Sequence, residues 1–481
     1  MAIKDNRHFI ATLEGTGDVV RIQQEVDWDL EVGAIVRRVC ETGSPAILCE
    51  RVKDYPDGYR LFGAPLATLR RLAVALGLPA DTPIREVYDI IDRRMSSPIK
   101  PVVIRREDAP CKENILLGEE VNLYQFPAPM IHDGDGGRYI ATWHAVVTKD
   151  PDSDWVNWGM YRGMIHNRRS LGGLCLPNTD QWKFMQKYWS RGVPMPFAIA
   201  IGMDPLSSAM AMTSVPAGES EVDYAGGLME EPIELVPCET NELMVPAHSE
   251  IVLEGEILPG VTVDEGPFSE FTGYRSAPRA PRIVYQVKAI TYRNDPILTL
   301  SSMGLPIHEG CLVGAATKHR EYKKRLVEAG IPVTDVCIPH EGAGFLLVVG
   351  VKPLYGSIAG QVGSVLGAQG RGVPGHIIVV DADVDPFNMN EVIHALATKC
   401  HPSRGVIIRD REPGIPLTPF LSREERKWGY GARVIFDCTW PVDWSRETET
   451  PPRASFQEDF PDIIKEKVLK NWATYGFPTT S

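Results

Sequence analysis

The chain has 481 residues, of which 43 % are hydrophobic and 23 % charged, and its formal net charge is -13 at pH 7. A chain of this length is too long for one hydrophobic core, so we expect two or three domains of an ordinary globular protein. The acidic balance argues against a nucleic-acid partner, and no apolar run approaches the roughly 20 residues that a membrane helix needs.

Residues 1–110 are expected to form a small α/β domain. Apolar residues recur at helical spacing in three segments, and one short apolar run is typical of a strand. The predicted helices cover 30–43, 65–78 and 83–95, and the predicted strand covers 45–52. A proline-rich join leads out of this domain.

Short β-type runs, separated by Gly, Pro, Asn and Asp, dominate residues 111–305. The pattern predicts strands at 139–150, 196–203, 251–258, 282–293 and 297–303. Regular short strands of this kind indicate a β-barrel or a sandwich.

A linker follows at 306–330, and its part from 315 onward is predicted to be a charged helix that ends at Gly330. Strands and helices alternate over 331–481, which predicts a second α/β domain. The last amphipathic segment, 462–477, suits docking on another subunit.

The cysteines and histidines give little sign of a metal site. The nine cysteines are scattered without a CxxC pair, and the first residues lack an apolar secretory core, which favours a cytoplasmic enzyme with reduced thiols. The histidines form no HExxH or other paired spacing. A metal would need scattered oxygen ligands, shared with a ligand phosphate as in many magnesium sites.

The stretch VDEGPFSEFTGY, 263–274, places Glu265 and Glu270 five residues apart around a Gly-Pro pair. A strand would send the two side chains to opposite faces, and a helix would leave them off one stripe. Because Pro267 fixes its own φ and biases the preceding residue away from helix, we expect an irregular turn after a strand. Such a turn lets both carboxylates converge on one cavity.

Three further segments have unusual polar or glycine content. DWVNWGMYRGM, 154–164, carries Asn157 and Arg162, and an arginine beside two carboxylates would hold them ionised. MTSVPAGESEVDYAGGL, 212–228, offers acidic oxygen ligands and, at its start, hydroxyls and backbone N–H groups that suit a phosphate. The glycines of 360–375 do not match the dinucleotide pattern GxGxxG, so we interpret them as close helix packing.

Five motifs in a fixed order resemble the UbiD family of (de)carboxylases over nearly the whole chain. They are NWGMYR, GESEVDYAGG, CETNELMVPAHSEIVLEGEI, EGPFSEFTGY and DADVDPFNMNEVIHALATKCHP. The FTGY form and the segment after it look closest to the aromatic and phenolic acid branch. The resemblance implies a small N-terminal α/β domain, a central split β-barrel that binds flavin, a linker helix and a C-terminal α/β oligomerisation domain.

The resemblance also implies an activity, which is reversible non-oxidative decarboxylation of an aromatic acid. The family uses prenylated FMN, whose added ring forms a reversible covalent adduct with the substrate. The catalytic trio would be Arg162, Glu265 and Glu270. Glu265, paired with Arg162, is expected to stay charged, and Glu270 is expected to donate a proton to the reacting carbon.

The binding residues follow from the same resemblance. Asn157 and Glu221 match ligands of a divalent ion, manganese or magnesium, that bridges the cofactor phosphate, with potassium as a companion ion. The family's third ligand is usually a histidine in the segment that here reads PNTDQWKFMQKYW, so Thr179, Asp180 or Gln181 fills that place, and we take Gln181 forward. The expected flavin contacts, besides Asn157, Arg162, Gln181 and Glu221, are Met160, Tyr161, Thr213, Ser214 and Val215. The expected substrate pocket comprises Phe271, Leu312, Ile415 and Leu417, with His308 near a ring hydroxyl or second acidic group.

The expected partners are a small aromatic carboxylic acid, a flavin prenyltransferase as cofactor supplier, and further copies of the chain in a homodimer or homohexamer. Two alternatives remain open: a split-barrel flavin oxidoreductase with structural glutamates, and a non-catalytic subunit of a decarboxylase complex. The sequence does not name the acid, because a few pocket side chains decide it.

Overall fold

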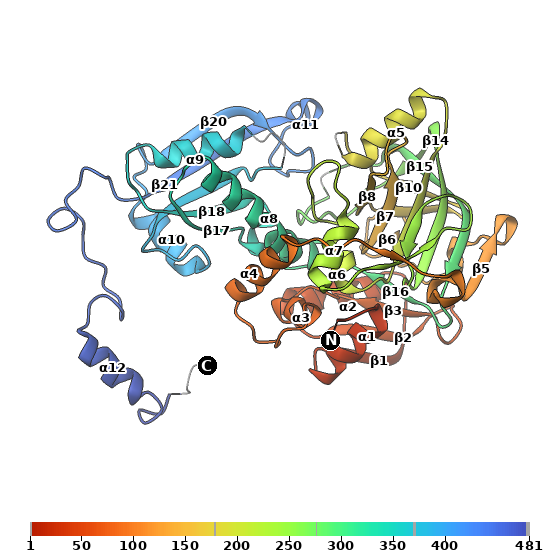
Figure 1. Cartoon of the computed structure of the whole chain (residues 1–481), viewed down its shortest axis with the longest axis horizontal. Helices are drawn as coiled ribbons and strands as arrows, with labels where there is room; N and C mark the ends of the chain where they lie inside the picture. The colour runs from red at the N-terminus through yellow and green to blue at the C-terminus, as the bar shows by residue number, and fades with distance from the viewer. Residues whose placement is uncertain (1, 178, 276, 369–371, 478–481) are drawn as a thin grey trace.

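The computed structural model describes residues 2–177, 179–275, 277–368 and 372–477. Its first unit is a four-stranded sheet in the order β1-β2-β3-β16, with helices packed around it (Figure 1). The strands are β1 (Val19–Val26), β2 (Ala46–Val52), β3 (Arg60–Gly63) and β16 (Ile297–Leu300). The helices are α1 (Asn6–Gly15), α2 (Glu31–Thr42), α3 (Leu69–Ala75) and α4 (Ile84–Met95).

Strand β16 lies far from the other three strands in sequence. It was predicted as a strand of the central barrel, but it pairs in parallel with β3 of the first sheet. All four of its residues are buried. Hydrophobic patterning predicts a buried strand here, yet it carries no information about which sheet the strand joins. The chain therefore returns from β15 (Ala280–Tyr292) of the curled central sheet to the first unit, where β16 completes the first sheet.

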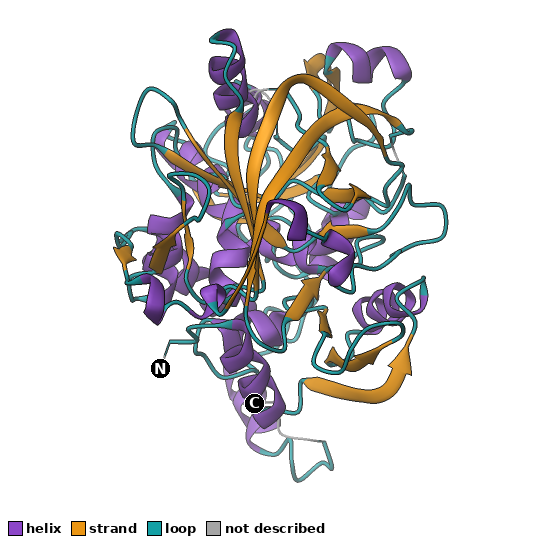
Figure 2. Cartoon of the chain, turned by 90° about the vertical axis from the view of Figure 1, so that its right-hand side faces the viewer, coloured by secondary structure: helices purple, strands orange, loops and turns teal. Residues whose placement is uncertain are grey.

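The central unit is one strongly curled antiparallel sheet in the order β6-β9-β10-β15-β14-β11-β7-β8, with β5 paired to β15 (Figure 2). The strands are β5 (Asn114–Leu117), β6 (Tyr139–Ala141), β7 (His144–Lys149), β8 (Val156–Gly159), β9 (Gly163–Asn167), β10 (Ser170–Gly173), β11 (Met195–Ile201), β14 (Ile251–Glu265) and β15 (Ala280–Tyr292). The ends of this order, β6 and β8, are not neighbours in the sheet, so the barrel is split as expected.

Strand β11 of the curled sheet is buried on both faces. Along β11, Ala198 and Ala200 belong to one hydrophobic cluster, while Phe197, Ile199 and Ile201 belong to another. Alternate residues of a strand point to opposite faces, so both faces are covered. The covering elements include α5 (Asp180–Ser190), α6 (Pro205–Met210), α7 (Glu221–Met229) and a small sheet of β4 (Val102–Val103), β12 (Glu234–Pro237) and β13 (Met244–Pro246).

The C-terminal unit is a five-stranded sheet in the order β17-β18-β19-β21-β20, reached through the long helix α8 (Glu309–Glu328). Its strands are β17 (Val333–Cys337), β18 (Leu346–Val351), β19 (His376–Asp381), β20 (Val406–Pro413) and β21 (Tyr430–Cys438). Its helices are α9 (Ile358–Gly367), α10 (Met389–Thr398) and α11 (Arg423–Trp428). A Cβ on Gly363 would lie 2.9 Å from Ile435, which confirms close packing of the glycine-rich helix; residues 369–371 lie outside the described chain.

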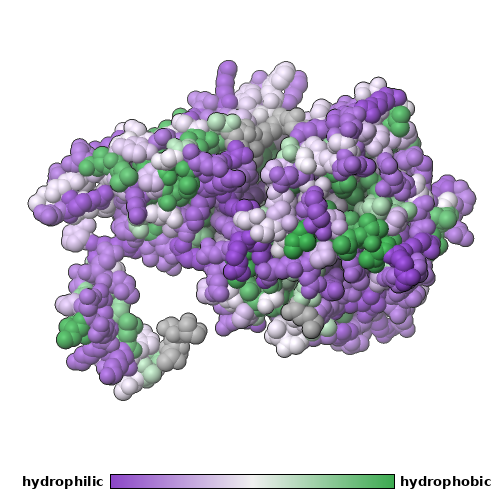
Figure 3. Space-filling model, viewed as in Figure 1, coloured by the Kyte–Doolittle hydropathy of each residue, from purple (hydrophilic) through white to green (hydrophobic). Residues whose placement is uncertain are grey.

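The end of the chain extends away from the body and carries α12 (Asp462–Lys470) (Figure 1). Several large side chains on it are exposed, and Figure 3 shows green patches on this arm. These side chains are Ile463, Ile464, Leu469, Tyr475 and Phe477. Among the helices that the structure describes, none combines the length and apolar character needed to cross a membrane.

Candidate active site

The two glutamates of the Gly-Pro motif lie at the end of β14 and in the turn that follows it. Glu265 is the last residue of β14 and pairs with Ala280 of β15. Gly266 has a φ of 85°, a left-handed conformation that favours glycine, so the chain bends immediately after the strand. The irregular turn expected from the sequence is thus present between the two longest strands of the curled sheet.

Arg162 contacts both glutamates, an arrangement that the family resemblance implied. It lies between β8 and β9, and its Nε and Nη2 donate to the two carboxylate oxygens of Glu265 at 2.8 and 2.9 Å. Its Nη1 contacts Glu270 Oε1. The Phe268 ring lies 5.1 Å from the guanidinium carbon. A bidentate arginine of this kind fixes the carboxylate geometrically as well as electrostatically.

Tyr139 completes the buried network, and no motif in the sequence pointed to it. Its hydroxyl donates to Glu265 Oε1 at 2.8 Å, and its ring lies 4.4 Å from that of Phe268. Burial, reinforced by the adjacent Glu265 carboxylate, raises the pKa of the Tyr139 hydroxyl. The phenol therefore remains a donor, and Glu265 accepts hydrogen bonds on both of its oxygens.

A cavity of about 230 Å³ opens beside this network. Its wall is mainly apolar, with Arg162 and Glu270 among its polar members. The lining residues are Thr142, His144, Met160, Tyr161, Arg162, Leu174, Leu176, Thr179, Phe268, Glu270, Phe271, Met303 and Leu417. Glu265 is fully buried behind Arg162, so Glu270 is the member of the acidic pair that borders the cavity.

The residues expected around the substrate fall into two groups. Phe271 from the catalytic turn and Leu417 from the C-terminal unit line the cavity, so the site lies between two domains. Leu312 instead packs in a hydrophobic core, and Ile415 borders a separate cavity of about 30 Å³. His308 is fully buried and bonds to backbone groups. These three residues are outside the cavity lining that the described chain forms.

His144 is a further member of the wall that the sequence did not single out. It is fully buried in β7, and burial lowers its pKa to about 4, so the imidazole is neutral at pH 7. Its Nε2 lies 3.0 Å from the Tyr161 carbonyl oxygen, which makes Nε2 the protonated nitrogen. Nδ1 has no partner within the described residues and is left as an acceptor beside the cavity.

The three expected metal ligands are all buried, and two of them have unpartnered atoms. Glu221, the first residue of α7, accepts from the Trp158 backbone N–H at 2.7 Å, yet burial raises its pKa to about 8. The amide nitrogen of Asn157 and the amide oxygen of Gln181 have no partner among the residues described. The Glu221 carboxylate and the free amide oxygen of Gln181 are the kinds of group that a cation prefers, whereas the unpartnered atom of Asn157 is its amide nitrogen, a hydrogen-bond donor.

The neighbours of Gln181 are occupied by other contacts. Thr179 caps α5 by accepting from the Trp182 N–H at 3.3 Å, and Asp180 pairs with Lys183 at 2.7 Å. Gln181 donates to the Tyr285 hydroxyl at 2.6 Å and keeps its carbonyl oxygen free. Of the three candidates in this segment, whose residue 178 lies outside the described chain, Gln181 fits best. Groups of three or more His, Cys, Asp or Glu that suit a metal do not occur in the described ranges.

Apart from the metal ligands, three of the expected flavin contacts border the cavity, and the other three, 213–215, are outside its lining. Met160, Tyr161 and Arg162 line the cavity. Thr213 is buried after α6, where its hydroxyl donates to the Ala209 carbonyl at 3.0 Å and meets the Thr317 hydroxyl of α8 at 3.1 Å. Ser214 next to it is exposed, and Val215 is half-buried. The loop from 213 to 215 therefore offers its polar groups close to the linker helix.

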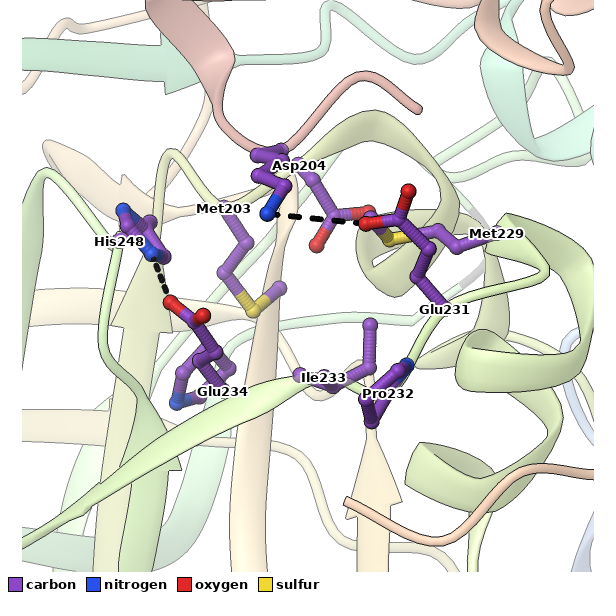
Figure 4. A pocket seen from close by; sticks show the side chains of 10 residues that line it. Met203, Asp204, Met229, Glu231, Pro232, Ile233, Glu234 and His248 are labelled. Carbon is purple, nitrogen blue, oxygen red and sulfur yellow. Dashed lines mark hydrogen bonds and ion pairs between the residues drawn. The ribbon is translucent and has the colours of Figure 1, made fainter. Parts of the chain in front are cut away.

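A second hollow, near the N-terminus, is too small for an aromatic acid (Figure 4). It measures about 30 Å³, and acidic side chains, His248 and Lys4 surround it. His248 lies 2.7 Å from Glu234, and Lys4 lies 3.6 Å from Glu231. These contacts pair the charges with one another, so the hollow holds no more than a small solvent molecule.

Each of the three structural units matches a domain model of one enzyme family. The model described as the 3-octaprenyl-4-hydroxybenzoate carboxy-lyase Rift-related domain matches residues 102–306. The models of the N-terminal and C-terminal domains of the same enzyme match residues 10–91 and 311–438.

Individual proteins match over nearly their whole length. The chain is 35 % identical to the pyrrole-2-carboxylic acid decarboxylase of Pseudomonas aeruginosa, with 98 % of each chain covered. The closed form of the vanillic acid decarboxylase of Sedimentibacter hydroxybenzoicus has a TM-score of 0.87 at 32 % identity, with 99 % of each chain covered. An evolved dimeric form of the UbiD-class enzyme HmfF from Pelotomaculum thermopropionicum, in complex with prFMN, has a TM-score of 0.79 at 28 % identity and covers 92 % of this chain and 96 % of its own.

Proposed function

The chain belongs to the UbiD family of carboxy-lyases and decarboxylates aromatic acids, and we propose that it does so with prenylated FMN bound beside Arg162, Glu265 and Glu270. One observation supports the division of roles most directly. Of the two glutamates, Glu270 borders the cavity, while Glu265 is sealed behind Arg162.

The reaction leaves an electron pair on a ring carbon when carbon dioxide departs. Prenylated FMN, when bound, supplies the electron-accepting system that stabilises this charge. Glu270 then delivers a proton to the ring carbon, since its carboxyl group lies on the cavity wall. Arg162 contacts Glu270 and stabilises the carboxylate that remains after the proton has left.

Glu265 acts as the fixed anion of the trio. Its two oxygens accept from Arg162, and Oε1 also accepts from Tyr139, so its carboxylate is held in one orientation. This anion orients the guanidinium toward Glu270. In the reverse direction Glu270 removes the ring proton, and high bicarbonate favours carboxylation.

Asn157, Gln181 and Glu221 are the residues that would hold a divalent ion, manganese or magnesium, with potassium as a companion. Their support is the buried Glu221 carboxylate and the unpartnered amide oxygen of Gln181, and Asn157 would bind the ion through its own amide oxygen. A cation there would neutralise the cofactor phosphate and stabilise the ionised form of Glu221. Ser214, whose side chain is exposed, would contribute its hydroxyl on the phosphate side, whereas the Thr213 hydroxyl is engaged by Ala209 and Thr317.

The mainly apolar wall favours a small aromatic acid over a ligand with several charges. Phe271, Met303 and Leu417 would pack on its ring. Acids of the kinds named for the relatives, pyrrole-2-carboxylic and vanillic acid, fit this description and are the first candidates.

Assembly and supply complete the proposal. The exposed apolar side chains of α12 would be covered by a second copy of the chain, giving a homodimer or a homohexamer. A flavin prenyltransferase would provide the modified cofactor in the cytoplasm.

The test is to co-express the chain with a flavin prenyltransferase, measure the mass of the released cofactor, and assay carbon dioxide release from a panel of aromatic acids. We expect the mass of prenylated FMN and turnover of at least one acid. Plain FMN with no carbon dioxide release from any acid would instead support a flavin oxidoreductase or a non-catalytic subunit.

A further inference from the structure

The residues on both sides of Glu270 are hydrogen-bonded to buried side chains from other parts of the chain. On the preceding side, Asp135 Oδ1 accepts from the Ser269 backbone N–H at 3.0 Å and from the Ser269 hydroxyl at 3.1 Å. The Asp135 side chain is completely buried. A carboxylate that takes two hydrogen bonds from one residue fixes that residue firmly.

Asp135 is itself fixed. Its Oδ2 lies 3.0 Å from His132 Nδ1, and His132 Nε2 lies 3.2 Å from the Ser302 hydroxyl at the end of β16. The next residue, Gly136, donates its backbone N–H to the Pro267 carbonyl oxygen at 2.7 Å. A Cβ on Gly136 would lie 2.1 Å from the Gly266 carbonyl oxygen, so only glycine allows this close approach.

On the following side, His308 holds Phe271. Its Nδ1 accepts from the Gly310 backbone N–H at 3.1 Å, so Nε2 carries the proton and donates to the Phe271 carbonyl oxygen at 3.1 Å. His308 is fully buried and caps α8, the helix that leads to the C-terminal unit. The Phe271 ring also stacks on Phe345 of that unit, with centroids 6.2 Å apart.

Arg162 contacts the Glu270 carboxylate directly, and Arg275 Nε donates to the Ser269 hydroxyl at 3.0 Å. The backbone of Glu270 itself, however, has no bond to another part of the described chain. Its own backbone hydrogen bonds stay within the turn, from the Glu270 N–H to the Tyr274 carbonyl and from the Gly273 N–H to the Glu270 carbonyl. Such local bonds shape the turn but do not anchor it to the rest of the molecule. Asp135 and His308 are the buried side chains that anchor the two immediate neighbours of Glu270, Ser269 and Phe271.

We propose that Asp135 and His308 are positioning residues of the decarboxylation: acting through Ser269 and Phe271, they hold the Glu270 carboxyl at the cavity. This inference rests on the proposed function of Glu270. Proton transfer depends on heavy-atom distances of about 2.6–3.2 Å, so a small shift of the turn lowers the rate without changing how the acid binds.

The first experiment measures kcat and KM of cofactor-loaded Asp135→Ala, with Asp135→Asn as the conservative variant and the exposed Asp133→Ala on the same loop as the matched control. We expect kcat of Asp135→Ala to fall by about 10- to 100-fold with KM nearly unchanged. Asp135→Asn keeps an acceptor for Ser269 and should restore most of the rate, and Asp133→Ala should match wild type.

His308→Leu tests the second anchor, the hydrogen bond from His308 to the Phe271 carbonyl oxygen. It also provides an independent test if Asp135→Ala does not fold. Its kcat should fall equally for acids with and without a ring hydroxyl. A wild-type kcat in the folded variants would refute the proposal. A raised KM confined to hydroxylated acids would refute the role of His308, because it would make the imidazole a substrate contact.

The second readout needs no turnover. In cofactor-free protein, hydrogen exchange of a peptide spanning 266–274 should be faster in Asp135→Ala than in wild type and in Asp133→Ala, because Ser269 loses the acceptor for its N–H. If hydrogen exchange of this peptide were the same in Asp135→Ala and wild type, Asp135 would not anchor the turn. A wild-type protein that decarboxylates no acid while exchange still differs would instead count against the proposed function.

Discussion

Replacing Arg162 with methionine tests the buried ion pair at the centre of the site. The Arg162 side chain is 8 % exposed and that of Glu265 is fully buried, so neither charge is compensated by bulk water. Methionine fills much of the same volume but removes both hydrogen bonds to Glu265 and the contact with Glu270. Two buried carboxylates would then face each other without a cation.

The magnitude follows from these contacts. Each hydrogen bond to a charged group contributes about 1.5–3 kcal/mol, and removing one partner of a buried ion pair costs about 3–5 kcal/mol. We therefore expect the free energy of unfolding of Arg162→Met to fall by about 3–5 kcal/mol at pH 7.5. The double variant Arg162→Met/Glu265→Gln should recover part of this loss, because a neutral amide replaces the uncompensated carboxylate.

The assay is urea denaturation of cofactor-free protein, followed by fluorescence of its ten tryptophans. Arg168→Met is the matched control, since Arg168 lies on the exposed turn between β9 and β10. The control should unfold within about 0.5 kcal/mol of wild type. If Arg162→Met were as stable as this control, the pair would not carry the energy that its geometry implies.

Three further predictions concern the cofactor, pH and assembly. Glu221→Ala should lower the amount of flavin and metal that co-purifies, measured by cofactor mass and elemental analysis, and full retention would argue against Glu221 as a ligand. His144 and His308 have pKa values of about 4 in the folded chain because burial disfavours their charged forms, against 6.5 in the unfolded chain. Between pH 6.5 and 4 the unfolded chain therefore binds more protons than the folded chain. As the pH is lowered through this range, the free energy of unfolding should decrease by up to about 3 kcal/mol per histidine. A urea midpoint that stays constant from pH 7.5 to 5 would contradict this sign. Deleting residues 461–481 should reduce the number of subunits in the assembly, calculated from the molar mass measured by light scattering. An unchanged number of subunits would place the subunit contact elsewhere.

The local sequence pattern predicted the turn that carries the two glutamates, and the family resemblance predicted that they meet Arg162. Two glutamates flank a proline at an odd spacing, and that pattern is hard to reconcile with a strand or a helix. The structure confirms that Glu265 and Glu270 converge on Arg162. The family resemblance and the three-unit architecture are also confirmed, because family models match residues 10–91, 102–306 and 311–438.

The supporting residues were not predictable from the sequence. Tyr139 and Asp135 contact the catalytic turn from more than 120 residues away, and each lies in a segment with an ordinary pattern. The same holds for β16, whose four buried residues predict a strand but not its partner. Hydrophobic periodicity reports which face of an element is buried, and only tertiary contacts decide what lies against it.

The most direct test of the account is the rate of carbon dioxide release by Glu270→Gln, loaded with the same amount of cofactor as wild type and assayed on an acid that wild type turns over. Glutamine keeps the size of the side chain but cannot donate an acidic proton. The account predicts full cofactor retention and a rate at least about 100-fold lower. A rate within about twofold of wild type would contradict the assignment of Glu270 as the proton donor.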